Sequence, residues 1–335
     1  MNFIQGGARA GLLLSRAAGI SGDMTGIWNS ISAVLLVLLM VGVGYLFGLF
    51  GWMKAEHKPL VIRFLIYMAV PCMCVKNVFE YFTRQMLAQA GVLLLVPILF
   101  NLVTFAAALG IGRLARIPRK RFGGFAVMCA FSNSLFVGFP ITHELFGDAG
   151  IPYLMFYYIV NTAAFWTLGS LIIYRCGDAG KAFSLKASLK QLVSPPLVAL
   201  LGAIALLLAG VTLPHLVLTF TSYMSATVTP LALLYIGFLI YETGLRNLKP
   251  DRGIWIASAV RFIGAPALML LMCRIFGITG LARSVFFIEA AMPVMIQSVV
   301  VSGLAGADEK YNALGMSFTT LLCLVAIPVL MLILG

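Results

Sequence analysis

The sequence predicts an all-α integral membrane protein with ten transmembrane helices, arranged as two inverted repeats of five helices. Three observations lead to this fold class: an apolar composition, ten apolar segments of spanning length, and landmarks that recur at a nearly constant offset. Of the 335 residues, 61% are hydrophobic and only 10% are charged, and the mean hydropathy is +1.04. A soluble domain usually carries about 25% charged residues. Most of the surface must therefore face lipid, which excludes a purely soluble protein.

The ten apolar segments each have close to the roughly 20 residues that a helix needs to cross the hydrocarbon core. Backbone groups in lipid must satisfy one another, so each segment is expected to be a helix. The predicted spans are 27–49, 59–79, 87–112, 122–146, 152–174, 194–212, 216–241, 253–275, 282–304 and 311–334.

Four regions follow from these spans. They are an N-terminal extension over 1–26, a first five-helix repeat over 27–175, a cytoplasmic linker over 176–193 and a second repeat over 194–335. The extension has two interpretations, either a disordered segment or residues upstream of a true start at Met24.

The distribution of basic residues predicts the orientation in the membrane. Fifteen Lys and Arg residues fall in the odd-numbered loops, and five fall in the extension and the even-numbered loops. Cytoplasmic loops are enriched in Lys and Arg, so the odd loops are expected in the cytoplasm and both termini outside. The enrichment of Lys and Arg in cytoplasmic loops accounts for the net charge of +12, so no nucleic acid is expected as a partner. The expected location is the cell membrane, with the chain crossing it several times.

The two halves show matching landmarks. Three pairs recur at offsets of 159, 161 and 162 residues: Pro71 with Pro230, Arg113 with Arg274, and Arg121 with Arg283. A repeat of five spans inverts its topology because five is odd. Inverted repeats are typical of secondary transporters that work by alternating access.

The fourth and ninth predicted helices carry signals for interruption at mid-span. Three small polar residues in the fourth, Ser132, Asn133 and Ser134, are costly in lipid unless they face a cavity or unpaired backbone. Two broken helices that cross at the midplane would direct helix ends at a small ligand. The alternative is an ordinary proline kink with the polar side chains bonded to neighbouring helices. Helix breaks are predicted at Phe131, Gly138, Pro140 and Pro293, and also at Pro71 and Pro230.

The run from Phe131 to Ile141 resembles the Asn-small-x-x-x-Gly-x-Pro motif of the auxin efflux carrier family, within the bile/arsenite/riboflavin transporter superfamily. Further similarities are Ala290-Ala291-Met292-Pro293, Val193-Ser194-Pro195-Pro196, Thr229-Pro230-Leu231 and Ile236-Gly237. The resemblance extends from about Trp28 to the C-terminus. Ser132 stands where plant exporters have a proline, which favours a bacterial permease similar to the malonate transporters over an auxin carrier.

The resemblance implies a scaffold domain plus a transport domain with crossed helices 4 and 9, and an elevator-like or rocking motion. It places the crossover and substrate site at Asn133 and Pro293. The full set of predicted substrate-binding residues is Ser132, Asn133, Ser134, Met292, Pro293 and Gln297.

Charged residues inside the spans suggest a coupling site. Arg261 and Glu289 fall near the middle of the eighth and ninth helices, and Lys76 lies near the end of the second. A charge at mid-membrane depth needs a partner or a water-filled cavity. Two interpretations stay open: a structural Arg261–Glu289 ion pair, or Glu289 as a proton carrier with Arg261 as its charge partner. The excess of embedded positive charge favours an anionic substrate.

The sequence therefore predicts a secondary transporter for a small organic anion, such as a mono- or dicarboxylate. The coupling ion is expected to be a proton or sodium, and a homodimer is left open. No metal or other cofactor is expected, because the six cysteines form no CxxC pair. A transporter-fold membrane sensor is one alternative. An intramembrane enzyme is another, although no GxSxG, HExxH or paired-aspartate motif is present to support it.

Overall fold

The computed structural model describes residues 24–82, 90–178, 186, 195–244 and 249–334, and every regular element in these ranges is helical. The predicted extension over 1–26 and the predicted linker over 176–193 lie almost wholly outside the described residues. The first described helix begins at Met24.

The helices of the first half begin and end as follows: α2 Met24–Leu49, η1 Ala55–His57, α3 Lys58–Phe64, η2 Leu65–Ala69, α4 Val70–Tyr81, α6 Ala90–Leu114, α7 Arg119–Ala130, η3 Ser134–Gly138, α8 Phe139–Phe146, η4 Asp148–Gly150, α9 Ile151–Ala164, η5 Phe165–Gly169 and α10 Ser170–Cys176. Those of the second half are α12 Pro195–Leu208, α13 His215–Ala226, α14 Val228–Thr243, α15 Arg252–Ala259, η7 Val260–Gly264, α16 Ala265–Ile275, α17 Gly280–Ala290, α18 Gln297–Ala305 and α19 Glu309–Leu334.

Within the described residues, six helical rods are long and apolar enough to cross a membrane. They are Ala55–Tyr81, Ala90–Leu114, Asp148–Cys176, His215–Glu242, Arg252–Ile275 and Glu309–Leu334. Two shorter apolar helices, Leu35–Leu49 and Pro195–Leu208, fall on two further predicted spans. The remaining two predicted spans, 122–146 and 282–304, are helical but interrupted. All ten predicted segments are thus largely helical where the structure describes them, and six of them lie in rods that meet the length of a span.

The outer surface of these rods is apolar, as lipid contact requires. Leu39, Leu60, Ile263 and Val325 are each at least 60% exposed although all four are large hydrophobic residues. The six cysteines, by contrast, are buried and unpaired, which confirms that they act as small core residues.

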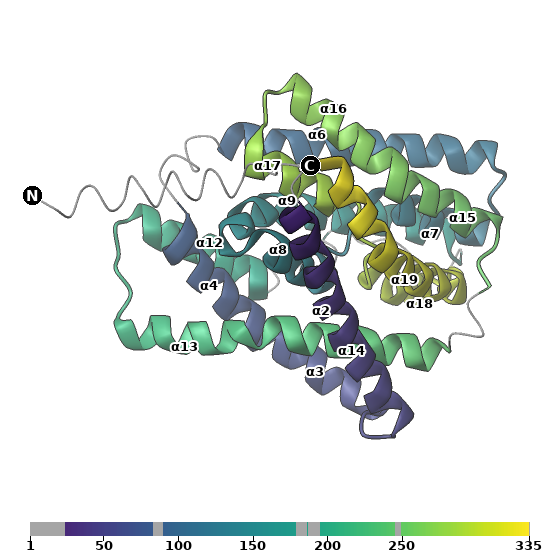
Figure 1. The fold of residues 1–335 in the computed structure, drawn as a ribbon. Helices are drawn as coiled ribbons and strands as arrows, with labels where there is room; N and C mark the ends of the chain where they lie inside the picture. The colour runs from purple at the N-terminus through teal and green to yellow at the C-terminus, as the bar shows by residue number, and fades with distance from the viewer. Residues whose placement is uncertain (1–23, 83–89, 179–185, 187–194, 245–248, 335) are drawn as a thin grey trace, which may run out of the picture.

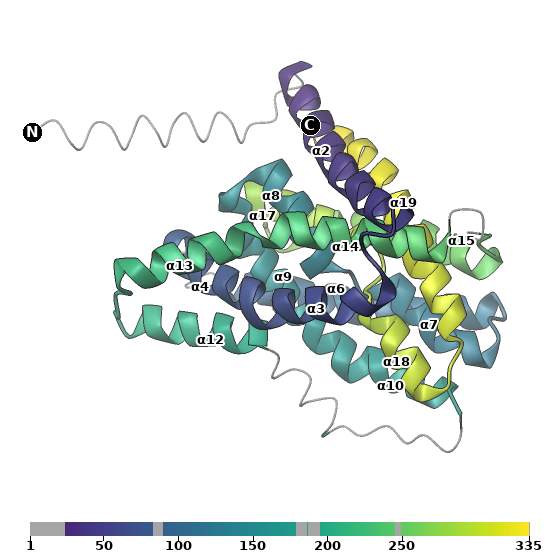
Figure 2. The same cartoon turned by 90° about the horizontal axis from the view of Figure 1, so that it is seen from below.

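The helices pack in two groups (Figures 1 and 2). In the first group, α2 lies along α14, and α4 packs against both α12 and α13. In the second, α6 packs against α7 and α9, α16 against α17, and α18 against α19. The groups meet where α8 and α19 contact α2 and α14. Figure 2 shows α13 and α14 as one long rod running past the second group.

Several predicted breaks are absent, because prolines in these helices follow π-helical turns. Pro71 comes two residues after η2, Pro140 two residues after η3, and Pro266 two residues after η7. A proline has no N–H, so the carbonyl four residues earlier loses its usual donor. A π turn shifts the bonding to i→i+5 and lets the helix continue. The predicted breaks at Pro71, Gly138 and Pro140 are therefore wrong.

The predicted break at Pro230 is displaced by one turn. Pro230 lies inside α14, and the interruption is at Thr227, between α13 and α14. Pro230 cannot donate to the carbonyl of Ala226, which is the last residue of α13. Regular bonding resumes at once, since the Leu231 N–H donates to the Thr227 carbonyl at 3.2 Å.

Ion pairs tie the start of α7 to α15 and α19. Arg121 Nε donates to Asp308 at 2.8 Å, and Arg121 Nη1 donates to Asp251 at 2.9 Å. Burial alone would raise the pKa of Asp308, but hydrogen bonds from the Tyr311 N–H and from Arg121 outweigh it and hold the pKa below its usual value. Asp308 consequently stays ionised at neutral pH, and the network joins segments from both halves of the chain.

Candidate functional site

The two interrupted helices meet at their unwound segments. After α7 ends at Ala130, Phe131 is extended, and the segment 291–296 separates α17 from α18. Ser132 and Val294 form an isolated antiparallel bridge, and the Asn133 N–H donates to the Pro293 carbonyl at 2.8 Å. The two helices thus end beside Phe131 and Pro293, where breaks are predicted. Two segments about 160 residues apart in sequence form one short piece of paired backbone inside the protein.

Buried side chains satisfy the backbone that the interruption leaves unpaired. Asn161 of α9 accepts from the Ser132 N–H at 3.0 Å and donates to the Ser132 carbonyl at 2.7 Å. Thr319 of α19 accepts from the Val294 N–H at 3.2 Å. Each unsatisfied group would cost several kcal/mol in an apolar interior. Neighbouring helices therefore fix the unwound segments in place.

Arg261 closes the C-terminal end of α7. Its guanidinium is fully buried, and it donates to the Met128 carbonyl from Nε at 3.0 Å and from Nη2 at 2.8 Å. Nη2 also donates to the Phe131 carbonyl at 2.6 Å, and Nη1 donates to Ser132 Oγ at 2.9 Å. A helix C-terminus carries partial negative charge, so it is a favourable place for a cation. The negative end of a half-helix, rather than a carboxylate, compensates Arg261.

Of the two interpretations left open by the sequence, the structural ion pair between Arg261 and Glu289 is wrong. The ion pairs among the described residues do not include either side chain. Spacing along the two helices places both charges at a similar depth, but it does not fix the direction in which each side chain points. The Arg261 guanidinium donates to the Met128 and Phe131 carbonyls instead of to the Glu289 carboxylate.

Glu289 lies on α17, fully buried, against the other half of the broken fourth helix. Its Oε1 accepts from the Thr142 hydroxyl of α8 at 3.0 Å. The Ser134 hydroxyl lies near the same carboxylate without completing a hydrogen bond to it. Oε2 has no hydrogen-bond partner among the described residues.

Because Gly138 of η3 has no side chain, the Glu289 carboxyl can lie directly against it. A Cβ atom at this position would lie 2.5 Å from Glu289 Oε1 and 2.7 Å from Oε2. Non-bonded atoms do not approach this closely. The glycine that resembles a helix breaker in the sequence is therefore required for close packing.

Gly138→Ala should destabilise the protein by about 1–3 kcal/mol, because it overpacks a filled interior. Gly110→Ala is the matched control, since a Cβ at Gly110 of α6 meets nothing within 4 Å. That control should be neutral or stabilising by up to about 1 kcal/mol through helix propensity. Thermal unfolding in detergent measures both. Equal melting temperatures for the two variants would contradict the close contact between Gly138 and Glu289.

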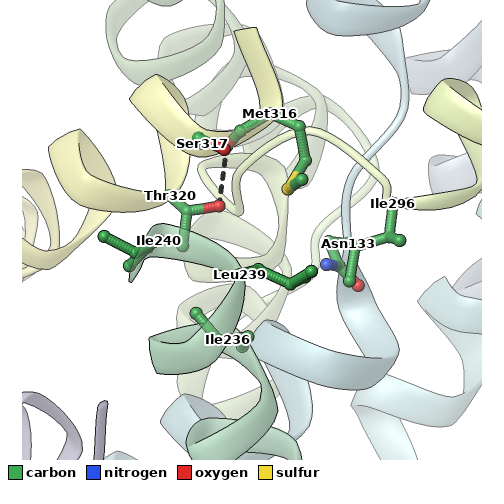
Figure 3. A pocket seen from close by; sticks show the side chains of 8 residues that line it. All are labelled: Asn133, Ile236, Leu239, Ile240, Ile296, Met316, Ser317 and Thr320. Carbon is green, nitrogen blue, oxygen red and sulfur yellow. Dashed lines mark hydrogen bonds between the residues drawn. The ribbon is translucent and has the colours of Figure 1, made fainter. Parts of the chain in front are cut away.

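A pocket opens beside the paired segments, where the two groups of helices meet (Figure 3). The space between its lining atoms is about 230 Å³ when the open solvent at its mouth is counted, and little of it is enclosed. Its lining residues are Asn133, Ile296, Ile236, Leu239, Ile240, Met316, Ser317 and Thr320. The first two come from the unwound segments, the next three from α14 and the last three from α19.

Asn133 is the polar group that the fourth helix presents to this pocket. Its Oδ1 accepts from the Phe136 N–H at 3.3 Å and so caps η3, while Nδ2 has no partner among the described residues. The residue is only 2% exposed. Figure 3 shows its side chain directed toward the space between α14 and α19. A buried amide with a free donor at a pocket wall can bind an acceptor of a ligand.

The other predicted substrate residues take different places. Ser132 is bonded to Arg261 and Tyr157, and Ser134 faces Glu289. Met292 is fully buried, and Pro293 contributes its carbonyl to the backbone pairing. Gln297 starts α18, with its Oε1 unpartnered among the described residues, but it does not line the pocket.

Sequence reasoning missed the walls that α14 and α19 supply. One signal could have found α19: the polar cluster Ser317, Thr319 and Thr320 inside an otherwise apolar helix. On α14, Ile236 belongs to the Ile236-Gly237 pair that resembles the family, but Leu239 and Ile240 carry no signal, because they resemble ordinary lipid-facing residues. Lys76, predicted as a further charged site residue, pairs instead with Glu80 at 3.7 Å, one turn along α4.

Apolar helical rods, two interrupted helices with paired unwound segments, and a pocket beside them define a multi-pass membrane protein of the transporter class. The chain matches the family described as membrane transport protein over residues 29–331, and it belongs to that family. The match confirms the resemblance to the auxin efflux carriers.

Two archaeal relatives are similar over nearly their whole length. An uncharacterized transporter of Methanocaldococcus jannaschii is 28% identical over 305 residues, covering 88% of this chain and 95% of the relative. An uncharacterized transporter of Methanothermobacter thermautotrophicus is 26% identical over 307 residues, covering 90% and 97%. Both names indicate a transporter and neither indicates a substrate.

Proposed function

We propose that this protein is a secondary transporter that moves a small organic anion, a mono- or dicarboxylate, by alternating access. The observation that carries the proposal is the free amide nitrogen of Asn133 at the wall of the pocket. This donor can bind a carboxylate oxygen, and a hydrogen bond to a charged group contributes about 1.5–3 kcal/mol.

The helix ends favour the same charge of ligand. Asn133 stands at the N-terminus of η3, which continues into α8, and the positive end of this half-helix dipole lies beside the pocket. Arg261 adds a buried positive charge on the far side of Ser132. Apolar walls from α14 and α19 suit the carbon chain of an organic acid rather than a hydrated inorganic ion.

The architecture that suits this function is the ten-helix inverted repeat, with the first repeat over 27–175, the linker over 176–193 and the second repeat over 194–335. In support, the helix interruptions follow Ala130 and Ala290, 160 residues apart, within the range of the sequence offsets. Asp148 and Asp308 show the same separation, and each precedes a long helical rod. The pocket lies between two groups of helices, so motion of one group against the other would expose it to alternate sides.

The transport activity is testable without knowing the substrate. The purified protein is screened by thermal shift against mono- and dicarboxylates, with matched amines and neutral amides as controls. Acids that stabilise it are then tested for uptake into proteoliposomes. We expect at least one carboxylate to bind and to be taken up. Stabilisation by amines alone, or uptake by none of the binding acids, would contradict the proposal.

Both termini should lie outside the cytoplasm in a cell membrane, because Lys and Arg favour the odd loops fifteen to five. A C-terminal reporter that is active only in the cytoplasm should be silent. The same reporter inserted in the 176–193 linker is the control and should be active. The reverse pattern would show that the orientation is inverted.

A further inference from the structure

We propose that Glu289 is a second ligand site of the carrier, one that binds a proton rather than the organic anion. The proposal rests on the proposed transport function, because it names the coupling ion of the same site.

Among the residues that the structure describes, Glu289 has no countercharge. Its side chain is fully buried, Oε1 accepts one hydrogen bond from Thr142, and Oε2 has no partner among the described residues. An ionised carboxylate in such a place is strongly disfavoured unless it is paired. Arg261, which could have neutralised it, donates to the carbonyls of α7 instead. A bound proton is the smallest change that restores neutrality.

The described elements that pack around Glu289 place no positive charge against its carboxyl either. α17 packs against η3, α8, η4, α9, α16 and α19. The titratable groups within electrostatic reach are Tyr157 of α9 and Cys323 of α19, both ordinarily uncharged at neutral pH. The charged or ionisable side chains toward the outer end of these elements are His143, Glu144 and Asp148, and His143 pairs with the other two at 3.5 and 3.4 Å. On α16, Arg274 is exposed, and on α17 itself Arg283 lies six residues before Glu289.

One short helix connects this carboxyl to the pocket. η3 begins after Asn133, whose amide faces the pocket, and it ends at Gly138, against which both Glu289 oxygens rest. Gly138 thus lies only five positions after Asn133 along the chain. A proton on Glu289 removes a negative charge that would repel an anion bound at the other end of this helix. Proton binding should therefore strengthen binding of an anion at Asn133, and linkage requires the converse.

Infrared difference spectroscopy of the purified protein tests the site directly. Between acid and alkaline pH, the wild type should show the C=O band of a protonated, buried carboxyl that disappears on titration. Glu289→Gln should lack this band, and the control Glu80→Gln should retain it, since Glu80 is a more exposed carboxylate on α4. A band that survives in Glu289→Gln, or no band in the wild type, would overturn the proposal. Stabilisation of the wild type, but not of Glu289→Gln, by sodium at constant pH would overturn it in favour of a sodium site.

Transport then separates this proposal from the proposed function. In proteoliposomes, uptake of the acids found by thermal shift should accelerate under a proton gradient in the wild type. In Glu289→Gln the gradient should have no effect, while exchange down the substrate gradient persists. Wild-type uptake that ignores the proton gradient would refute coupling and leave the carrier intact. Absence of all acid uptake would refute the carrier, and the infrared band would still decide whether Glu289 binds a proton.

Discussion

Replacing Asn133 with alanine should lower anion binding and uptake by roughly ten- to a hundredfold. The expected factor follows from losing one hydrogen bond to a charged group, about 1.5–3 kcal/mol, at about 1.4 kcal/mol per tenfold change in affinity. Folding should be nearly unaffected, because within the described residues the side chain makes one hydrogen bond, the cap to Phe136, worth about 1 kcal/mol. Thermal shift and proteoliposome uptake measure the two effects separately.

Asn77→Ala is the matched control for this variant. Asn77 on α4 is also 2% exposed and also has an Nδ2 atom without a partner among the described residues, but it does not line the pocket. Truncating it removes the same atoms from a buried site elsewhere. We expect normal uptake from Asn77→Ala. Equal losses in both variants would mean that buried amides support the fold in general, and Asn133 would then have no special role.

Replacing Arg261 with methionine should strongly destabilise the protein. The change leaves the Met128 and Phe131 carbonyls without the guanidinium, and each unsatisfied buried group costs about 1–3 kcal/mol. Arg261→Lys should also be destabilising, since an ammonium group cannot reproduce the planar fork that reaches both carbonyls. Arg274→Met is the control, because Arg274 is exposed at the end of α16 and should tolerate the change.

A double-mutant cycle distinguishes this arrangement from an ion pair. Arg261→Met combined with Glu289→Gln should give a coupling energy below about 0.5 kcal/mol, as expected for groups that share no direct contact. Coupling of several kcal/mol would mean that the two side chains pair directly. Unfolding of the four proteins in the same detergent supplies the measurement.

The helical membrane fold follows from the sequence without tertiary information. In a chain with 61% hydrophobic residues, the backbone polar groups of each apolar segment must hydrogen-bond within that segment. The apolar segments are accordingly helical in the described residues. The positions of the two interruptions were also predictable. Polar residues at mid-span and the proline at 293 mark places where regular bonding is costly, and the helices do end beside them.

The positions of the prolines alone did not predict where the helices break. Pro71 and Pro140 remove the same donor as any proline, yet their helices continue through π turns. A missing donor ends a helix or leaves it continuous depending on two things. One is which other group donates to the free carbonyl, and the other is how closely neighbouring helices pack against the segment. Arg261 donates to the Phe131 carbonyl and Asn161 donates to the Ser132 carbonyl, each from another helix.

The tertiary structure alone decided which groups meet. Depth along a helix is readable from the sequence, because each residue advances the chain by about 1.5 Å. The azimuth and the partner of a side chain depend on helix packing, which a single sequence does not encode locally. Arg261 and Glu289 lie at matching depths, but packing turns one toward the end of α7 and the other toward Gly138. The sequence thus determined that charges are buried and helices are broken. Only the packing of helices determined that the cation closes a helix end and that, within the described part of the chain, the carboxyl has no cationic partner.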